Sequence, residues 1–369
     1  MLPGHVDPAH VPMTPEVVHV APQLFGHRGL WGGGTRYSLE LARAVAQEVP
    51  ARLVTFGPER EHLRFGPLDI HVLKRRTFPH RDDDNPYSEL LPLELADAPI
   101  VHAHQIEGLP AGLAILLRRA LGRRVYATDL GGTGPLLARR LGVRRLVTGF
   151  LPISRYSASF YPELADRASV IYGGVDLDSF APGPPARDRS VVFVGRLMPH
   201  KGVHRLVEAI DPGTPLHVFG YPYDRGYVDD LRRLAAGKDV AIHESASDAE
   251  IVAALRGARV AVLPSLVHHG YGPDSPKAEL LGLTLLEAMA CGTPVVCTDQ
   301  CSMPEIVVAG ETGLVVPPND VAALGDAIRS LLDDGPRWRA MSAAAADHVR
   351  REFTWPRVAE RCLRAYAAG

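Results

Sequence analysis

The stretch Val191-Val-Phe-Val-Gly-Arg-Leu-Met-Pro-His-Lys-Gly-Val203 joins a continuous apolar run to the start of a helical pattern. An unbroken apolar run, as opposed to an alternating one, is typical of a strand that is buried on both faces. The run ends at Gly195, and a helix is predicted to begin near Val203. A buried strand followed by a helix is the repeating unit of parallel α/β sheets.

The same unit recurs along the whole chain. Apolar runs predict strands at residues 17–21, 52–56, 70–73, 100–103, 125–128, 146–150 and 170–172, and then at 191–194, 216–219, 240–243, 260–263, 295–298 and 314–316. Helical patterns lie between them at residues 36–48, 108–121, 205–210, 227–236 and 321–333. We therefore predict an α/β fold in each of two successive halves of the chain.

Length and composition set limits on the class of protein. A chain of 369 residues is expected to form two domains, and the Pro-rich residues 180–189 mark the linker between them. An amphipathic stretch, 355–366, ends the sequence. Lys plus Arg number 40 against 42 Asp plus Glu, for a net charge of −2, which argues against a nucleic-acid-binding protein.

Localisation is predicted from what the sequence contains. No apolar stretch approaches the ~18 residues of a membrane span, and the polar, proline-rich N-terminus does not resemble a signal peptide. Cys291, Cys297 and Cys301 lack the CxxC spacing of a metal site. With Cys362 they are the only four cysteines, so we expect apolar packing roles and a reducing, cytoplasmic compartment.

Ligands of parallel α/β sheets bind at the carboxyl ends of strands. After the strand at 191–194, the cations Arg196 and Lys201 precede a helix start, where free backbone N–H groups and the helix dipole attract anions. The segment predicts either an anion site or a solvated loop that carries two ordinary surface charges.

A second candidate is Glu279-Leu-Leu-Gly-Leu-Thr-Leu-Leu-Glu-Ala-Met-Ala-Cys-Gly-Thr-Pro-Val-Val296. Thr284 and Glu287 have the spacing of a capping box at a helix start. Alternatively, the Glu287 carboxylate accepts hydrogen bonds from two vicinal hydroxyls, as on a ribose. Glu279, in the preceding loop, is placed to reach a sugar ring.

A third segment, Trp31-Gly-Gly-Gly-Thr-Arg-Tyr37, allows a ligand to approach the backbone closely. It lacks the GxGxxG spacing of dinucleotide-binding folds, so NAD binding is a poor fit.

Taken with these segments, GRLMPHKG, ELLGLTLLEAMACGTPVV, SMPEIVVAGETGLVVPPND and VIYGGVDLDSF resemble the retaining nucleotide-sugar glycosyltransferases of family 4. The resemblance implies the GT-B fold, in which two Rossmann-like, doubly wound parallel-sheet domains face a central cleft. An acceptor-binding domain would comprise residues 1–185 together with the C-terminal helix 355–369. A nucleotide-sugar-binding domain would comprise residues 186–354.

The resemblance also implies roles for individual residues. Arg196 and Lys201 would hold the donor diphosphate, and Glu279 would contact the transferred sugar; these three are the expected catalytic residues. Glu287 would bind the ribose hydroxyls. The remaining donor contacts would come from the backbone of Gly282, Leu283 and Thr284, with Gly33 and Gly34 closing over the phosphates.

Two departures from the family pattern stand out. Where members carry a histidine in the loop after the strand matching 125–128, this chain has Asp129, a candidate sugar or acceptor contact together with His104. The loop before Glu279 is expanded to residues 266–278. It places His268, His269, Tyr271 and Asp274 where a donor sugar would lie, although a solvated surface loop explains them equally well.

Other charged features favour simpler interpretations. Asp82-Asp-Asp84 resembles a metal-binding motif but sits in a polar, proline-bounded loop, and the GT-B mechanism implies no bound metal. The arginine pairs 118/119, 123/124, 139/140 and 144/145 form either a peripheral membrane patch or, as we favour, solvated helix ends.

We therefore expect a hexosyltransferase that moves a sugar from a nucleoside diphosphate donor, with uridine the default base, to a hydroxyl acceptor with retention. The acceptor is a glycan, a lipid or a small natural product, and no cofactor besides the co-substrate is expected. The alternatives are a sugar-nucleotide epimerase or phosphorylase of the same fold, or a non-catalytic sugar-nucleotide-binding protein.

Overall fold

The computed structural model describes residues 4–5, 14–22, 33–76, 85–132, 142–183 and 188–369. Contacts divide the chain into two compact units, unit 1 (Met1–Gly173 with Trp355–Gly369) and unit 2 (Gly174–Thr354). The division therefore falls before the Pro-rich segment where the sequence placed the boundary. The reason is local, because the Val175 N–H donates to the Phe353 carbonyl at 2.8 Å and Arg256 Nε donates to the Ala181 carbonyl at 2.9 Å.

Unit 2 is organised around one parallel sheet. Its strands are β9 (Asp188–Val194), β10 (Leu216–Phe219), β11 (Val240–His243), β12 (Ala258–Leu263), β13 (Val295–Thr298) and β14 (Gly313–Val316). They lie in the order β11-β10-β9-β12-β13-β14, with every pair parallel. Because the winding reverses between β9 and β12, the carboxyl ends of these two strands border the crevice where such sheets bind ligands.

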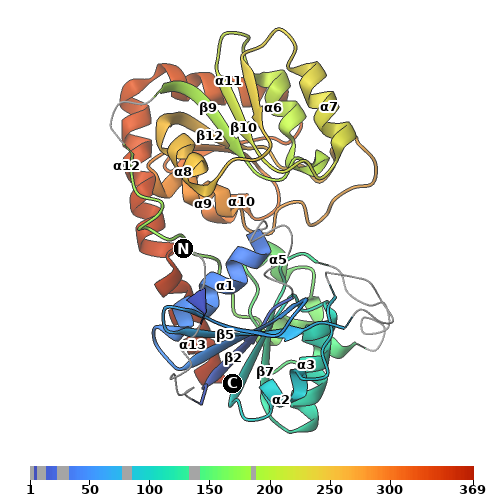
Figure 1. Cartoon of the computed structure of the whole chain (residues 1–369). Helices are drawn as coiled ribbons and strands as arrows, with labels where there is room; N and C mark the ends of the chain where they lie inside the picture. Colours follow the sequence, from blue (N-terminus) through green and yellow to red (C-terminus); the bar gives the residue numbers. More distant parts are fainter. Residues whose placement is uncertain (1–3, 6–13, 23–32, 77–84, 133–141, 184–187) are drawn as a thin grey trace. The chain divides into compact units, whose positions relative to one another are not determined.

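Helices cover both faces of this sheet. On one side lie α6 (Val203–Ala209), α7 (Arg225–Leu234) and α11 (Val321–Asp333), and on the other lie α8 (Asp248–Gly257), α9 (Leu283–Ala290) and α12 (Gly335–Glu352) (Figure 1). The apolar side chains of β9, from Val191 to Phe193, are consequently buried on both faces. A short helix, α10 (Met303–Ile306), follows β13.

Unit 1 has a mixed sheet. Its strands are β1 (Gly4–His5), β2 (Val17–Val20), β3 (Ala51–Gly57), β4 (Glu61–Phe65), β5 (Leu68–Lys74), β6 (Ile100–His104), β7 (Arg124–Thr128) and β8 (Gly149–Phe150), in the order β1-β4-β5-β3-β2-β6-β7-β8. β4 runs antiparallel to β1 and β5, and the remaining pairs are parallel.

Two predicted strands of unit 1 differ in the structure. Residues 170–172 form no strand, and the run at 146–150 is reduced to β8 because Val143–Leu146 form a 3₁₀ turn.

Among the described residues, helices pack on both faces of the unit 1 sheet. α1 (Gly33–Ala46) packs with α13 (Trp355–Ala368), and α2 (Leu91–Leu95) packs with α3 (Leu109–Ala120) on the opposite face (Figure 1). Tyr37 and Trp355 meet edge to face, with ring centroids 5.4 Å apart. Within the described part of the chain, none of the helices is both long and apolar enough to cross a membrane.

A chain of buried hydrogen bonds fastens α13 to the sheet. Thr128 Oγ1 donates to the Leu151 carbonyl at 2.9 Å, so it must accept the 2.7 Å bond from His102 Nε2. His102 therefore carries its proton on Nε2, and its Nδ1 accepts from the Tyr366 hydroxyl at 2.7 Å. One tautomer thus connects the C-terminal helix to β6 and β7.

Candidate functional site

Two of the predicted site residues form an ion pair at the crevice of unit 2. Lys201, in the turn after β9, places its Nζ 2.7 Å from Oε2 of Glu279, in the connection after β12, and 3.0 Å from the Ala278 carbonyl. The two side chains are only 10% and 14% exposed. Oε1 of Glu279 accepts the Gly282 N–H at 3.0 Å. Lys201 and Glu279 therefore supply each other with an opposite charge and a hydrogen-bond partner.

Arg196 lies in a different environment. It is exposed, and its guanidinium carbon sits 5.6 Å from the ring centre of Tyr223, which is 42% exposed. His200 stands between the two cations in the sequence. Burial, reinforced by the charges of Lys201 and Arg196, lowers the pKa of His200 to about 3. His200 is therefore neutral, and the positive charge of this turn comes from Arg196 and Lys201.

The start of α9 supplies backbone donors. The helix begins at Leu283 after Gly282, whose φ of +88° is in the left-handed region, and no side chain caps its N-terminus. The predicted Thr284–Glu287 capping box is therefore wrong, because the N-cap is Gly282 and Thr284 already lies inside the first turn. Leu283, Thr284 and Glu287 are the half-buried residues of α9, whereas the rest of the helix is buried. The Leu285 N–H already donates to the Gly282 carbonyl at 2.9 Å, so the N–H groups of Leu283 and Thr284 are the ones that can meet an anion here.

The expanded loop before Glu279 folds back on itself. The Ser275 N–H donates to the Val267 carbonyl at 3.0 Å, and Nδ1 of the exposed His268 lies 2.7 Å from the Asp274 carboxylate. His269 is buried, and its Nδ1 accepts the Tyr271 N–H at 3.2 Å. His268 and Asp274 are thus exposed, as a solvated loop predicts, whereas His269 holds the loop together.

Tyr271 connects this loop to the helices beneath it. Its ring centre lies 5.0 Å from that of His204, on α6, and 5.1 Å from that of Tyr227, on α7. The ring remains 40% exposed, so its other side can still meet a ligand.

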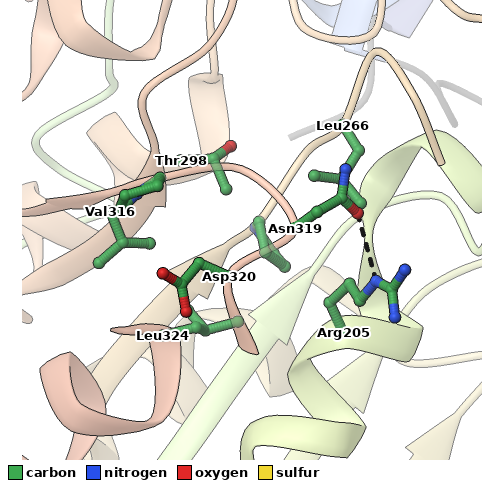
Figure 2. Close-up of a pocket in the computed structure, with 9 residues that line it drawn as sticks. Arg205, Leu266, Thr298, Val316, Asn319, Asp320 and Leu324 are labelled. Carbon is green, nitrogen blue, oxygen red and sulfur yellow. Dashed lines mark hydrogen bonds between the residues drawn. The ribbon is translucent and has the colours of Figure 1, made fainter. Parts of the chain in front are cut away.

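A small pocket lies on the α6 and α11 side of the same sheet edge. Figure 2 shows Leu266, Thr298 and Val316 around it, together with the 3.2 Å hydrogen bond from Arg205 Nε to Asn319 Oδ1. Pro264, which also lines the pocket, packs against the turn that carries Lys201, since a Cβ on Gly202 would lie 1.9 Å from the Pro264 carbonyl oxygen.

The site residues predicted in unit 1 are placed as follows. Gly33 and Gly34 form the first turn of α1, which begins at Gly33, ahead of the predicted start. Asp129 is fully buried, and it accepts the Gly131 N–H at 3.0 Å. Its charge, after burial itself, raises the pKa of Tyr161 far above the ordinary value. Asp129 therefore holds a turn together, and its burial does not favour a sugar contact.

His104 belongs to a buried cluster with His19 and His102, in which one ring nitrogen of each lies within 4.8 Å of the others. His19 Nδ1 and His104 Nε2 are 3.0 Å apart, and burial lowers the pKa of all three, that of His19 to about 3. The rings of His102 and His104 stack at 4.6 Å with 24° between their planes. A metal ion lies near the plane of each imidazole that binds it, so this stacking speaks against a shared ion.

The cysteines and the other charged motifs complete the comparison. All four cysteines are free thiols, and burial raises the pKa of Cys297 and of Cys362 to about 12. Asp82–Asp84 lie outside the described residues, as do Arg139 and Arg140. Arg118 is not solvated, because its side chain is fully buried and donates to the carbonyls of Leu95, Ala98 and Pro99 at the end of α2.

Sequence reasoning missed Tyr223 and Ser302. Tyr223 lies in the β10–α7 loop, at the same sheet edge as Arg196, and a search of every strand end would have found it. Ser302 donates through Oγ to the Glu279 carbonyl at 3.1 Å, and nothing in its local sequence predicts that partner.

Two curated proteins are similar to this chain in sequence. The GDP-mannose-dependent α-(1-6)-phosphatidylinositol monomannoside mannosyltransferase of Mycolicibacterium smegmatis is 33% identical over 69% of this chain and 75% of its own length. The glycogen synthase of Mycobacterium tuberculosis is 32% identical, over 57% of this chain and 50% of its own length.

Solved structures share the fold. The sucrose-phosphate synthase of Thermosynechococcus elongatus has a TM-score of 0.71 at 20% identity, over 95% of this chain and 98% of its own. Anabaena HepE, in complex with UDP and glucose, has a TM-score of 0.74 at 16% identity, over 96% of this chain and all of its own.

The family described as "Glycosyl transferases group 1" matches residues 175–348, which lie within unit 2. With the mannosyltransferase similar over most of both sequences, and with the α/β architecture of both units, the chain belongs to the group 1 glycosyl transferases and has their GT-B fold.

Proposed function

We propose that this glycosyltransferase moves a hexosyl group from a nucleoside diphosphate sugar to an acceptor hydroxyl with retention of the anomeric configuration. The observation that carries the proposal is the Lys201–Glu279 pair, which lies at the switch point of the unit 2 sheet and is joined to the start of α9 through Gly282. A cation, a carboxylate and uncapped N–H groups together suit a sugar that is linked to a diphosphate.

The proposed roles follow from burial and charge. Negative charge accumulates on the diphosphate as its bond to the sugar breaks, and Arg196, Lys201 and the first turn of α9 stabilise it. Glu287, half-buried on α9, takes the ribose hydroxyls. Glu279 is held by Lys201 and Gly282, so it contacts the sugar from a fixed position and is not proposed as a nucleophile.

We propose that the reaction needs no metal ion, since two cations and a helix N-terminus can neutralise the leaving diphosphate. Uridine is the base that we propose. Guanosine is the competing base, since the M. smegmatis relative is named for GDP-mannose. The acceptor is a glycan, a lipid or a small natural product, and the cytoplasm is the proposed compartment.

The first test is thermal stabilisation of the purified chain by UDP-, GDP- and ADP-sugars. A ligand at 100 times its Kd adds about 2.7 kcal/mol to the free energy of unfolding. Stabilisation by one of the three that is lost in Arg196→Ala supports the site, whereas equal stabilisation of Arg196→Ala contradicts it.

The second test measures turnover. A transferase releases nucleoside diphosphate at a rate that depends on added acceptor, and EDTA leaves that rate unchanged if no metal is needed. NMR of the product reports the anomeric configuration. Interconversion of the donor sugar without nucleotide release would indicate an epimerase, phosphate-dependent release a phosphorylase, and binding without turnover a non-catalytic protein.

A further inference from the structure

The exit of β13 holds both ends of the expanded loop 266–278. Three alternate residues make the contacts, each to a different point of the β12–α9 connection. Thr298 Oγ1 donates to the Ser265 carbonyl at 2.6 Å, and Gln300 Oε1 accepts the Val267 N–H at 2.9 Å. Ser302 Oγ donates to the Glu279 carbonyl at 3.1 Å. The thirteen residues between Ser265 and Glu279 are therefore held at both ends by the last residue of β13 and the segment that follows it.

Ser302 occupies the N-cap position of α10 but does not cap it. Serine at this position normally accepts a backbone N–H from the first turn of its own helix. Here the side chain makes no such bond, and the hydroxyl is given to Glu279 instead. Ser302 is also fully buried, so its hydroxyl is shielded from solvent and its hydrogen bond must come from the protein. The Ser302 hydroxyl thus bonds to the Glu279 carbonyl in place of stabilising the N-terminus of α10.

The backbone next to Ser302 adopts a conformation that is uncommon for a residue with a side chain. Cys301 has φ of +57°, in the left-handed region that a residue with a side chain occupies at a cost in backbone strain. The turn directs Ser302 toward Glu279. α10 also reaches the other end of the Glu279 turn, because the Ile306 side chain lies 3.2 Å from where a Cβ on Gly282 would be.

We propose that Ser302 is a positioning residue for donor binding, a role that rests on the function proposed above. Its hydroxyl donates to the Glu279 carbonyl at 3.1 Å, beside a longer bond of 3.4 Å from its own N–H, and the Glu279 carboxylate in turn orients the Lys201 ammonium and the Gly282 N–H. Ser302 touches no substrate. Its effect on a bound diphosphate passes through Glu279 to Lys201, at the end of a loop of thirteen residues.

The test measures the Kd of UDP, with GDP and ADP in parallel, by calorimetry. Ser302→Ala is expected to weaken nucleotide binding by about three- to tenfold, the effect of one lost buried hydrogen bond. Ser330→Ala is the matched control, because its hydroxyl also donates to a backbone carbonyl, that of Ala327 at 2.8 Å, but within α11. It is expected to change Kd by less than about twofold.

The background of Lys201→Met separates positioning from general destabilisation. If Ser302 acts through Lys201, Ser302→Ala has no further effect on Kd once Lys201 is gone. Equal weakening in both backgrounds, or a Ser302→Ala Kd equal to that of Ser330→Ala, overturns the proposal. Ser302→Cys keeps a weak donor, is expected to give an intermediate Kd, and replaces the alanine variant in both comparisons if that variant fails to fold.

Failure of the inference is distinguishable from failure of the proposed function. A wild-type chain that binds none of the three nucleotides refutes the donor site and the positioning role together. If the wild type binds a nucleotide and Ser302→Ala leaves its Kd unchanged, the positioning role alone is refuted.

Discussion

Replacing Lys201 with methionine should lower the stability of unit 2 as well as donor binding. Methionine keeps most of the length of the side chain but removes the ammonium, which leaves the Glu279 carboxylate with the Gly282 N–H as the remaining partner among the contacts described. Breaking a fully buried ion pair costs about 3–5 kcal/mol. With 10% and 14% of the side chains exposed, we expect about 2–3 kcal/mol here.

For a unit of this size, each kcal/mol corresponds to about 2–4 °C in Tm, so the unit 2 transition should fall by roughly 4–12 °C in calorimetry. The matched control is Arg196→Ala. Arg196 is exposed against Tyr223, so its loss should change the free energy of unfolding by less than about 0.5 kcal/mol while still weakening nucleotide binding. A Lys201→Met variant that melts within a degree of the wild type would refute the claim that this pair stabilises the site.

Three further outcomes are expected. Burial holds the pKa of His19 near 3 and lowers that of its two histidine neighbours, so the unfolded chain takes up protons below pH 6.5 that folded unit 1 does not. The free energy of unfolding is therefore full above about pH 6.5 and falls as the pH drops toward 3, by up to about 1.4 kcal/mol per pH unit for each histidine. Urea titrations from pH 7 to pH 5 measure this slope, and an equal slope in His19→Gln would count against it. Tyr366→Phe should destabilise unit 1 by about 1–3 kcal/mol through the unpartnered imidazole that it leaves, with unchanged nucleotide affinity; a matching loss of affinity would contradict a purely structural role. Gly202→Ala should destabilise unit 2 by far more than Gly237→Ala in thermal melts, because both have positive φ but only the first Cβ meets a carbonyl oxygen, at 1.9 Å; equal costs would show that backbone strain alone matters.

The parallel architecture could be predicted because strands that are buried on both faces have unbroken apolar runs in their sequences. Strands β9 to β14 were all found in this way, and α11 was predicted with its observed bounds, Val321–Asp333. Strand β4, Glu61–Phe65, was missed because its charged residues break the apolar pattern. Helix α8 was also missed, although Ser247 and Glu250 form a capping box at its start that local reading would have detected.

The site was predictable where chemistry is local and unpredictable where it depends on tertiary contacts. The spacing of Arg196 and Lys201 indicated an anion site, but nothing in the sequence indicates that Lys201 pairs with Glu279 and that Arg196 stays exposed. The capping-box prediction at Thr284 failed because the N-cap is Gly282, whose positive φ glycine adopts readily, so the helix begins before Thr284. His104 pairs with His19 across two strands, a partner that no linear pattern contains.

The return of α13 to unit 1 has a consequence for how this protein is made. Trp355 and Tyr366 complete the packing around α1 and β6, yet the ribosome delivers them after every residue of unit 2. The part of the chain that is synthesised first is therefore the last to be finished, because its sheet lacks the packing of α13 beside α1 until translation has passed through all of unit 2.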